Sequence, residues 1–193
     1  MRARDAAGNA DPSPATHAWT ITAPSCVAST ATMGSDRDSW VLQSSSGSNF
    51  GTDSDLKVNS KSGSGNSRAL VRFGLPSVPS GCQVTSARLR LYAGSYQSGR
   101  TLQALRLNGN WTETAVTWSN QPATTGAAAT APSRSSAGYV EWTVTAQVQS
   151  MYSGANHGFL VRDSAENGGG FEQAFHSREK GDNRPQLVVT FGS

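Results

Sequence analysis

Short apolar-rich runs, some of which alternate with polar residues, recur along the chain and are separated by stretches rich in Gly, Ser, Asn, Asp and Pro. A period of two places apolar side chains on one face of a β-strand, and frequent breaks mark turns between strands. The clearest run, 84–92, points Arg88, Arg90 and Tyr92 away from its apolar face. The runs with this character are 40–42, 56–58, 69–73, 84–92, 102–107, 140–144, 159–161, 171–175 and 187–191. They predict an all-β, antiparallel sandwich or barrel.

The composition leaves little room for helices. Of the 193 residues, 36% are hydrophobic and only 15% are charged, and this Ser/Thr/Gly-rich balance disfavours long helices. One segment has helical spacing, with apolar residues at Val144, Val148, Met151 and Tyr152. We expect one short helix there, with Thr145 as its N-cap and Gly154 ending it. Low-complexity stretches predict loops at 44–47, 60–66 and 124–137.

Residues 1–23 differ in character from the rest of the chain. A polar, turn-rich stretch at 2–12 precedes an alternating stretch at 16–22, and one strand with one turn cannot bury a core. The pattern R-A-x-D-A-A-G-N-x-D resembles the last hairpin of bacterial immunoglobulin-like domains. We therefore expect 1–23 to be the C-terminal remnant of an upstream immunoglobulin-like domain with its linker, and 24–193 to be one β-sandwich module.

The two cysteines, Cys26 and Cys82, lie far apart and form no C-x-x-C motif. The three histidines, His17, His157 and His176, are dispersed, so the sequence offers no zinc site. We interpret the cysteines as a disulfide of a secreted or cell-surface protein, the alternative being two unrelated buried thiols. No apolar run is long enough to span a bilayer, and the start of the chain lacks a signal-peptide pattern, so we expect an export signal upstream.

The formal net charge is +3, and arginine carries most of the positive charge. The arginines are scattered, whereas a nucleic-acid-binding protein shows a denser basic stripe, so nucleic acid is disfavoured as a partner. Arg88 and Arg90 share one face of the run 84–92. That face is either a solvated strand surface or a surface that binds a polyanion.

No motif of a known catalytic type is present. The chain lacks G-x-S-x-G, a P-loop, G-x-G-x-x-G after a strand, and H-E-x-x-H. Glycoside hydrolysis needs two carboxylates across a cleft, and no spacing singles out a pair among Glu113, Glu141, Glu166, Glu172 and Glu179. We therefore predict no catalytic residue and no cofactor.

Three acidic positions leave a structural calcium ion open as a hypothesis. Asp53, Asp55 and the loop 163–167 supply oxygen atoms of the kind that Ca²⁺ prefers, although none fits an EF-hand. The alternative is that these side chains satisfy loop backbone groups.

Two further segments have two interpretations each. Trp111 and Trp118 bracket a loop that ends at Pro122, and they either stack on sugar rings or pin the loop into the core. The segment around His176 and Arg178 either forms structural charge pairs or lines a ligand groove together with His157 and Arg162. The candidate ligand-binding residues are thus Arg88, Arg90, Tyr92, His157, Arg162, His176 and Arg178.

A set of ordered motifs points to a known family. In chain order they are Asn-Phe-Gly-Thr at 49–52, Leu-Lys-Val at 56–58, Arg-Ala-Leu-Val-Arg-Phe at 68–73, Val-Thr-Ser-Ala-Arg-Leu-Arg-Leu-Tyr at 84–92, Trp-Thr-Glu at 111–113, Ser-Arg-Glu at 177–179 and Arg-Pro-Gln-Leu-Val-Val at 184–189. Together they resemble the DNRLRE domain, which is related to the disaggregatase-related repeats and to carbohydrate-binding module family 96. Gly74 departs from the pattern, which has Asp at that place.

The resemblance implies a jelly-roll-like β-sandwich of about 160 residues appended to large secreted or surface proteins, other domains of which would be its partners. It implies a non-catalytic carbohydrate-binding module, and some relatives bind acidic polysaccharides such as alginate. The mild arginine excess agrees with such a ligand. The alternative function is a structural or adhesive spacer without a sugar ligand.

Overall fold

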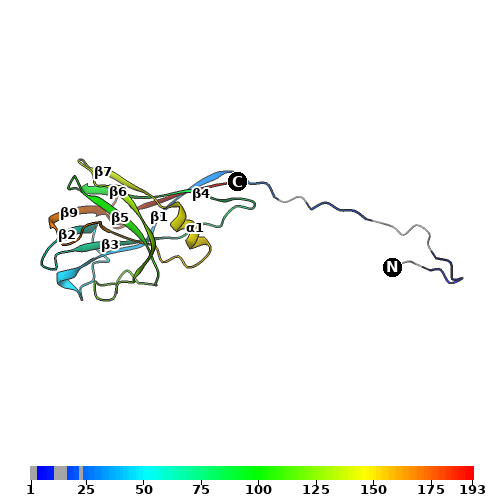
Figure 1. Ribbon diagram of the computed structural model, residues 1–193, viewed down its shortest axis with the longest axis horizontal. Coiled ribbons are helices and arrows are strands. Elements are labelled where there is room, and N and C mark those ends of the chain that lie inside the picture. Colours follow the sequence, from blue (N-terminus) through cyan, green and yellow to red (C-terminus); the bar gives the residue numbers. More distant parts are fainter. Residues whose placement is uncertain (1–3, 11–16, 22–23) are drawn as a thin grey trace.

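The computed structural model describes residues 4–10, 17–21 and 24–193 (Figure 1). Ten strands, one α-helix and one 3₁₀ turn, joined by loops, lie within residues 29–192. The strands are β1 (Ser29–Leu42), β2 (Asp55–Lys61), β3 (Ser67–Phe73), β4 (Gln83–Ser95), β5 (Thr101–Leu107), β6 (Thr124–Pro132), β7 (Gly138–Thr143), β8 (Phe159–Asp163), β9 (Gly169–His176) and β10 (Gln186–Gly192). The helices are η1 (Gln43–Ser45) and α1 (Thr145–Tyr152).

The strands form two antiparallel layers that share β1. The first half of β1 pairs with β10, and its second half, after an irregularity at Ser35 to Arg37, pairs with β3. Layer I contains β10, β4 and β7 side by side, and β9 and β2 extend it beyond the end of β10. Layer II continues from β3 through β8 and β5 to β6. Ser29 pairs with Phe191, so the chain enters the sandwich beside its own end (Figure 1).

The main core lies between the two layers. Alternate residues of each strand point into it, because the side-chain period of a strand is two. Layer I contributes Trp142, Leu89, Phe175 and Leu187, and layer II contributes Phe73, Leu102, Phe159 and Val161. The helix α1 closes one end of this core with its buried residues Val148 and Met151. The predicted all-β antiparallel sandwich with one short helix is confirmed, and its jelly-roll connectivity stays a prediction.

A second, smaller core lies on the outer side of layer II. The loop between β5 and β6 folds over that side and buries Trp111, whose indole N–H donates to the His157 carbonyl at 2.9 Å. Trp118 packs against the same cluster, with the Arg68 guanidinium 4.4 Å from its ring centroid. The core-pin interpretation of the tryptophan loop is therefore confirmed. The buried members are Val41, Leu70, Leu105, Leu107, Trp111, Val116 and Leu160.

The predicted disulfide between Cys26 and Cys82 is confirmed, and it fixes the segment that precedes β1 to the turn that precedes β4. Gly81 in that turn has φ +74°, and a Cβ there would overlap the Pro24 carbonyl group. The close approach of the two segments therefore requires glycine at position 81.

Several predicted elements differ from the structure. The stretch 124–137 was expected to be a loop, but its first nine residues form β6. The strand predicted at 40–42 is the end of the much longer β1. Thr145 is the first residue of α1 rather than its N-cap, and its hydroxyl instead accepts the Ala87 N–H at 3.0 Å.

The segment before residue 24 is described only in part. Residues 4–10 form a turn closed by an antiparallel bridge between Arg4 and Ala10. Residues 17–21 have no regular secondary structure, and the remainder of the strand predicted at 16–22 lies outside the described residues. The immunoglobulin-like origin of this segment stays a prediction. In the described part of the chain, no helix is long and apolar enough to cross a membrane.

Candidate functional site

The two outer faces of the sandwich differ in what covers them. On layer II the outward side chains of central strands are buried under the tryptophan loop, for example Leu70 (0% exposed) and Leu160 (2%). On layer I the outward side chain of Arg88 is 61% exposed. The tryptophan loop thus occupies the apolar centre of the outer face of layer II, whereas the outer face of layer I is open. The outer face of layer I is therefore the candidate site.

Paired strands bring charged side chains together on this face. Arg90 of β4 lies opposite Gln186 of β10 on one side and Glu141 of β7 on the other. Its guanidinium donates to the Glu141 carboxylate at 2.8 Å and to the Gln186 amide oxygen at 2.6 Å. Arg88 reaches the same carboxylate at 3.6 Å. We call the surface formed by Arg88, Arg90, Tyr92, Tyr139, Glu141 and His176 the β4–β7 face.

Aromatic rings continue the β4–β7 face beyond the charged row. Tyr92 and Tyr139 are opposite in the β4–β7 pairing, and their ring centroids are 5.3 Å apart with planes at 82°. The Arg90 guanidinium lies 4.2 Å from the Tyr139 ring centroid, and the ring centroids of His176 and Tyr92 are 4.8 Å apart. Burial raises the pKa of the Tyr139 phenol, although the charge of Arg90 opposes the shift, so the phenol is neutral at physiological pH. Arginine beside tyrosine offers both polar and apolar contacts to a sugar.

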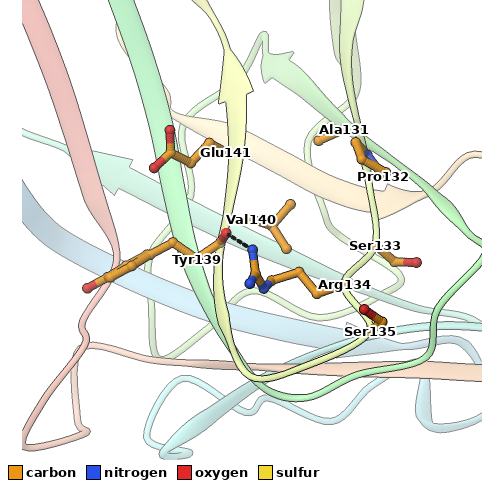
Figure 2. Close-up of a pocket in the computed structure, with 8 residues that line it drawn as sticks. All are labelled: Ala131, Pro132, Ser133, Arg134, Ser135, Tyr139, Val140 and Glu141. Atoms are coloured by element: carbon orange, nitrogen blue, oxygen red, sulfur yellow. Dashed lines mark hydrogen bonds between the residues drawn. The ribbon is translucent and has the colours of Figure 1, made fainter.

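Glu141 is among the residues that line two hollows. One, of about 300 Å³, is lined by Arg88, Arg90, Glu141 and Val188. The other, of about 490 Å³, is lined by residues 131–135 and 139–141. Figure 2 shows this second hollow, with Tyr139 and Glu141 projecting from one side of β7 and Arg134 on the other. Both hollows include Glu141, so they adjoin across β7.

The structure brings together only some of the predicted site residues. Arg88, Arg90, Tyr92 and His176 lie on one face, as the sequence pattern suggested for the first three. His176 also contacts the Asp182 carbonyl oxygen at 3.1 Å from its Nδ1 atom. These four residues form a continuous surface across β4 and β9.

The groove predicted from His157, Arg162, His176 and Arg178 does not form. His176 packs on Tyr92 in layer I, whereas Arg162 lies outward on layer II and donates to the Gln103 side chain at 3.0 Å. His157 holds Trp111 through its backbone carbonyl. The predicted groove is absent because His176 and Arg162 belong to strands of different layers, and the sequence does not show to which layer a strand belongs.

Arg178 has a structural role instead. Its guanidinium donates to the Glu113 carboxylate at 3.0 and 3.1 Å, and its backbone N–H donates to Asp38 at 2.9 Å. The Glu113 carboxylate also accepts the Asp38 N–H at 2.8 Å. These contacts join the last loop, β1 and the tryptophan loop. The interpretation of the 176–179 segment as structural charge pairs is supported for Arg178.

The carboxylates considered for calcium have protein partners. Asp53 accepts the Trp40 indole N–H at 2.9 Å, and Asp55 pairs with Lys180 at 3.3 Å. Asp163 receives two hydrogen bonds of 2.8 Å from the Arg100 guanidinium. Within the described ranges, no group of three or more His, Cys, Asp or Glu residues could hold a metal ion. The calcium ion stays a prediction, and these contacts favour the alternative in which the acidic side chains satisfy protein groups.

Three residues of the site region, Tyr139, Glu141 and Arg134, were not among the candidates predicted from the sequence. A usable signal was present for the first two, because Val140 and Trp142 share the inner face and their neighbours must point outward. The pairing of β7 with β4 is what places them beside Arg90, and no local pattern shows that pairing. Arg134 lies in a loop, where the period of two gives no direction.

Comparison with known proteins agrees with the geometry. The profile of carbohydrate-binding module family 96 matches residues 29–191. A search of curated proteins returned no match for the chain. Modules of this kind bind carbohydrates and are generally non-catalytic. Because the profile spans both layers of the sandwich, the chain belongs to carbohydrate-binding module family 96.

Proposed function

We propose that this domain is a non-catalytic extracellular module that binds an acidic polysaccharide on the β4–β7 face, within a larger secreted or surface protein. The observation that carries the proposal is the contrast between the two outer faces. The tryptophan loop covers the apolar centre of one face, and the other face presents arginine and tyrosine side chains at the surface. Membership in a carbohydrate-binding family supplies the ligand class.

The exposed guanidinium of Arg88 favours an anionic sugar. Arg88 and Arg90 share the carboxylate of Glu141, and a second carboxylate, that of Asp182, lies 3.7 Å from the His176 ring at the other end of the face. Arg88 is the more available of the two, because its one ion pair is long and its side chain is mostly exposed. Guanidinium groups bind carboxylates and sulfate esters through paired N–H donors. Tyr92 and Tyr139 add the apolar contact that pyranose rings need.

The disulfide supports an extracellular setting. Disulfides persist in oxidising compartments and are rare in the cytosol. The Cys26–Cys82 bond lies where the chain enters the sandwich, so it would protect the fold at the point where another domain pulls on it.

The test is affinity electrophoresis of the domain, followed by calorimetry, with a polyuronate, a sulfated polysaccharide and a neutral glucan. We expect binding to the acidic polymers that weakens as salt concentration rises, because exposed charges are screened. Arg88→Gln should weaken polyuronate binding about tenfold, which corresponds to about 1.4 kcal/mol. Loss of this side chain should not destabilise the fold, because its ion pair is exposed.

The matched control is Arg162→Gln, which removes the same charge from the outer face of layer II. Its affinity should stay within about twofold of that of the unmodified domain, since only a general charge effect would act. Equal losses in both variants would show that net charge, rather than the β4–β7 face, determines binding. No binding to any of the polymers would favour the structural or adhesive spacer instead.

A further inference from the structure

We propose that Arg134 forms a separate anion subsite on the other side of β7, which accepts one carboxylate or sulfate ester group of a sugar. The inference deepens the proposed function and rests on it for the polymeric nature of the ligand. The subsite is the hollow of about 490 Å³ lined by residues 131–135 and 139–141 (Figure 2).

The protein holds the Arg134 guanidinium in place without using all of its donors. Its Nε–H donates to the Ser136 carbonyl oxygen at 3.1 Å, and Nη1 donates to the Tyr139 carbonyl oxygen at 3.1 Å. A guanidinium has five N–H groups, so three remain on Nη1 and Nη2 beyond these two hydrogen bonds. The two terminal nitrogens are the pair that grips an oxyanion side by side.

Gly138 makes room for this arrangement. Its φ is +148°, and a Cβ at this position would lie 2.9 Å from the Cζ, Nε and Nη2 atoms of Arg134. The guanidinium therefore lies directly against the backbone of the residue that begins β7. A side chain fixed in this way loses little conformational entropy when a ligand binds.

Arg134 differs from most of the other arginines in its lack of an acidic partner. Arg68, Arg90, Arg100 and Arg178 each reach a carboxylate oxygen at 3.0 Å or less. Among the ion pairs of the described residues, none includes Arg134. The half-buried Arg134 guanidinium lies in a concave site and, within the described ranges, has no carboxylate to offset the cost of removing its charge from water. Such a cation attracts an anion.

The surroundings of the hollow define the ligand further. Ser135 contributes a hydroxyl group of the kind that hydrogen-bonds to sugar hydroxyls, whereas the Ser133 hydroxyl accepts the Arg100 backbone N–H at 2.9 Å. Pro132 and Val140 contribute apolar surface. β7 lies between this hollow and the one at Arg88 and Arg90, and its residue Glu141 lines both. A glycan with negative charges on more than one sugar unit could therefore contact the β4–β7 face and Arg134 together. A glycan with a single isolated charge would use only one of them.

The alternative is that Arg134 has a purely structural role, since its two hydrogen bonds join its own turn to the start of β7. The experiment must therefore report on the ligand at Arg134 itself. We would follow the side-chain Nε–Hε signals of arginine by ¹⁵N NMR while adding glucuronate in one series and methyl sulfate in another. Arg134→Gln identifies the signal, and Arg162→Gln identifies that of a control arginine on layer II.

We expect the Arg134 signal to shift in a saturable way with either anion and the Arg162 signal not to move. A response to glucuronate alone would identify a uronate subsite, and a response to methyl sulfate alone would identify a sulfate subsite. In parallel, Arg134→Gln should weaken polyuronate binding about tenfold, and Arg134→Lys should fall between it and the unmodified domain, because lysine keeps the charge but loses the paired donors.

The outcomes separate this inference from the proposed function. If the polymers do not bind but glucuronate or methyl sulfate shifts the Arg134 signal, the proposed function is wrong and the Arg134 subsite stands. If polyuronate binds but neither small anion shifts the Arg134 signal, or the Arg162 signal shifts equally, the subsite is refuted. A loss of thermal stability in Arg134→Gln with unchanged polymer affinity would show that the role of Arg134 is structural.

Discussion

The carboxyl group of Asp38 makes the stability of this domain dependent on pH. Asp38 is fully buried, and its Oδ2 atom accepts the Ser35 hydroxyl and the Arg178 N–H, each at 2.9 Å. Its Oδ1 atom has no hydrogen-bond partner among the described residues. Burial raises the pKa of Asp38 to about 7; the two hydrogen bonds oppose the shift, and the charges of Glu179 and Glu113 add to it.

The direction of the effect follows from the protons bound in each state. In the unfolded chain Asp38 has its ordinary pKa of 3.8, so between pH 3.8 and about 7 the folded state holds a proton that the unfolded state has released. The free energy of unfolding therefore falls as pH rises through this window and levels off above it. A difference of about three pKa units at about 1.4 kcal/mol each gives a loss of roughly 4 kcal/mol between pH 4 and pH 8.

Asp38→Asn isolates this contribution. The amide keeps an oxygen that can accept the Arg178 N–H, but it cannot ionise. Urea unfolding followed by tryptophan fluorescence at pH values from 4 to 8 would give the free energy of unfolding of both proteins. We expect the unmodified domain to lose roughly 4 kcal/mol more than the variant across this range. Parallel pH profiles for the two proteins would refute the reasoning, whatever their absolute stabilities.

The other predictions concern what holds the fold together. Trp111→Ala should lower the free energy of unfolding by about 3 to 5 kcal/mol, because it removes a 5%-exposed ring from the second core. Urea unfolding measures this loss. A loss of polysaccharide affinity in a variant that still folds would argue against the separation of the two outer faces. Replacing Cys26 and Cys82 together by serine should cost about 4 kcal/mol on the chain-entropy estimate for a separation of 56 residues; an unchanged urea midpoint would contradict it.

The sequence predicted strands where alternating apolar residues enter the main core, and it failed where strands carry small polar side chains. The runs at 84–92 and 187–191 show a period of two because Leu89 and Leu187, among others, are buried between the layers. β6 has the sequence Thr-Thr-Gly-Ala-Ala-Ala-Thr-Ala-Pro and buries only Ala131. Its strand conformation comes from pairing with β5, and no side-chain pattern reports that pairing.

The sequence predicted the face to which the side chains of β4 point, but not which residues of other strands lie beside them. The period of two correctly placed Arg88, Arg90 and Tyr92 on one face of β4. It could not show that Tyr139 and Glu141 lie opposite them, because pairing between strands so far apart in sequence is decided by the whole topology. For Arg178 the sequence left a structural and a ligand-binding interpretation open, because its carboxylate partner Glu113 lies in a distant loop.

The arrangement separates the residues that stabilise the fold from those proposed to face a ligand. The main core, the second core and the disulfide all lie away from the outer face of layer I. Exposed ion pairs such as Arg88 with Glu141 contribute at most about 1 kcal/mol each, so the outward positions of β4 and β7 can change without loss of the fold. Ligand specificity is therefore to be sought at the outward positions of β4 and β7 and in the turn that carries Arg134.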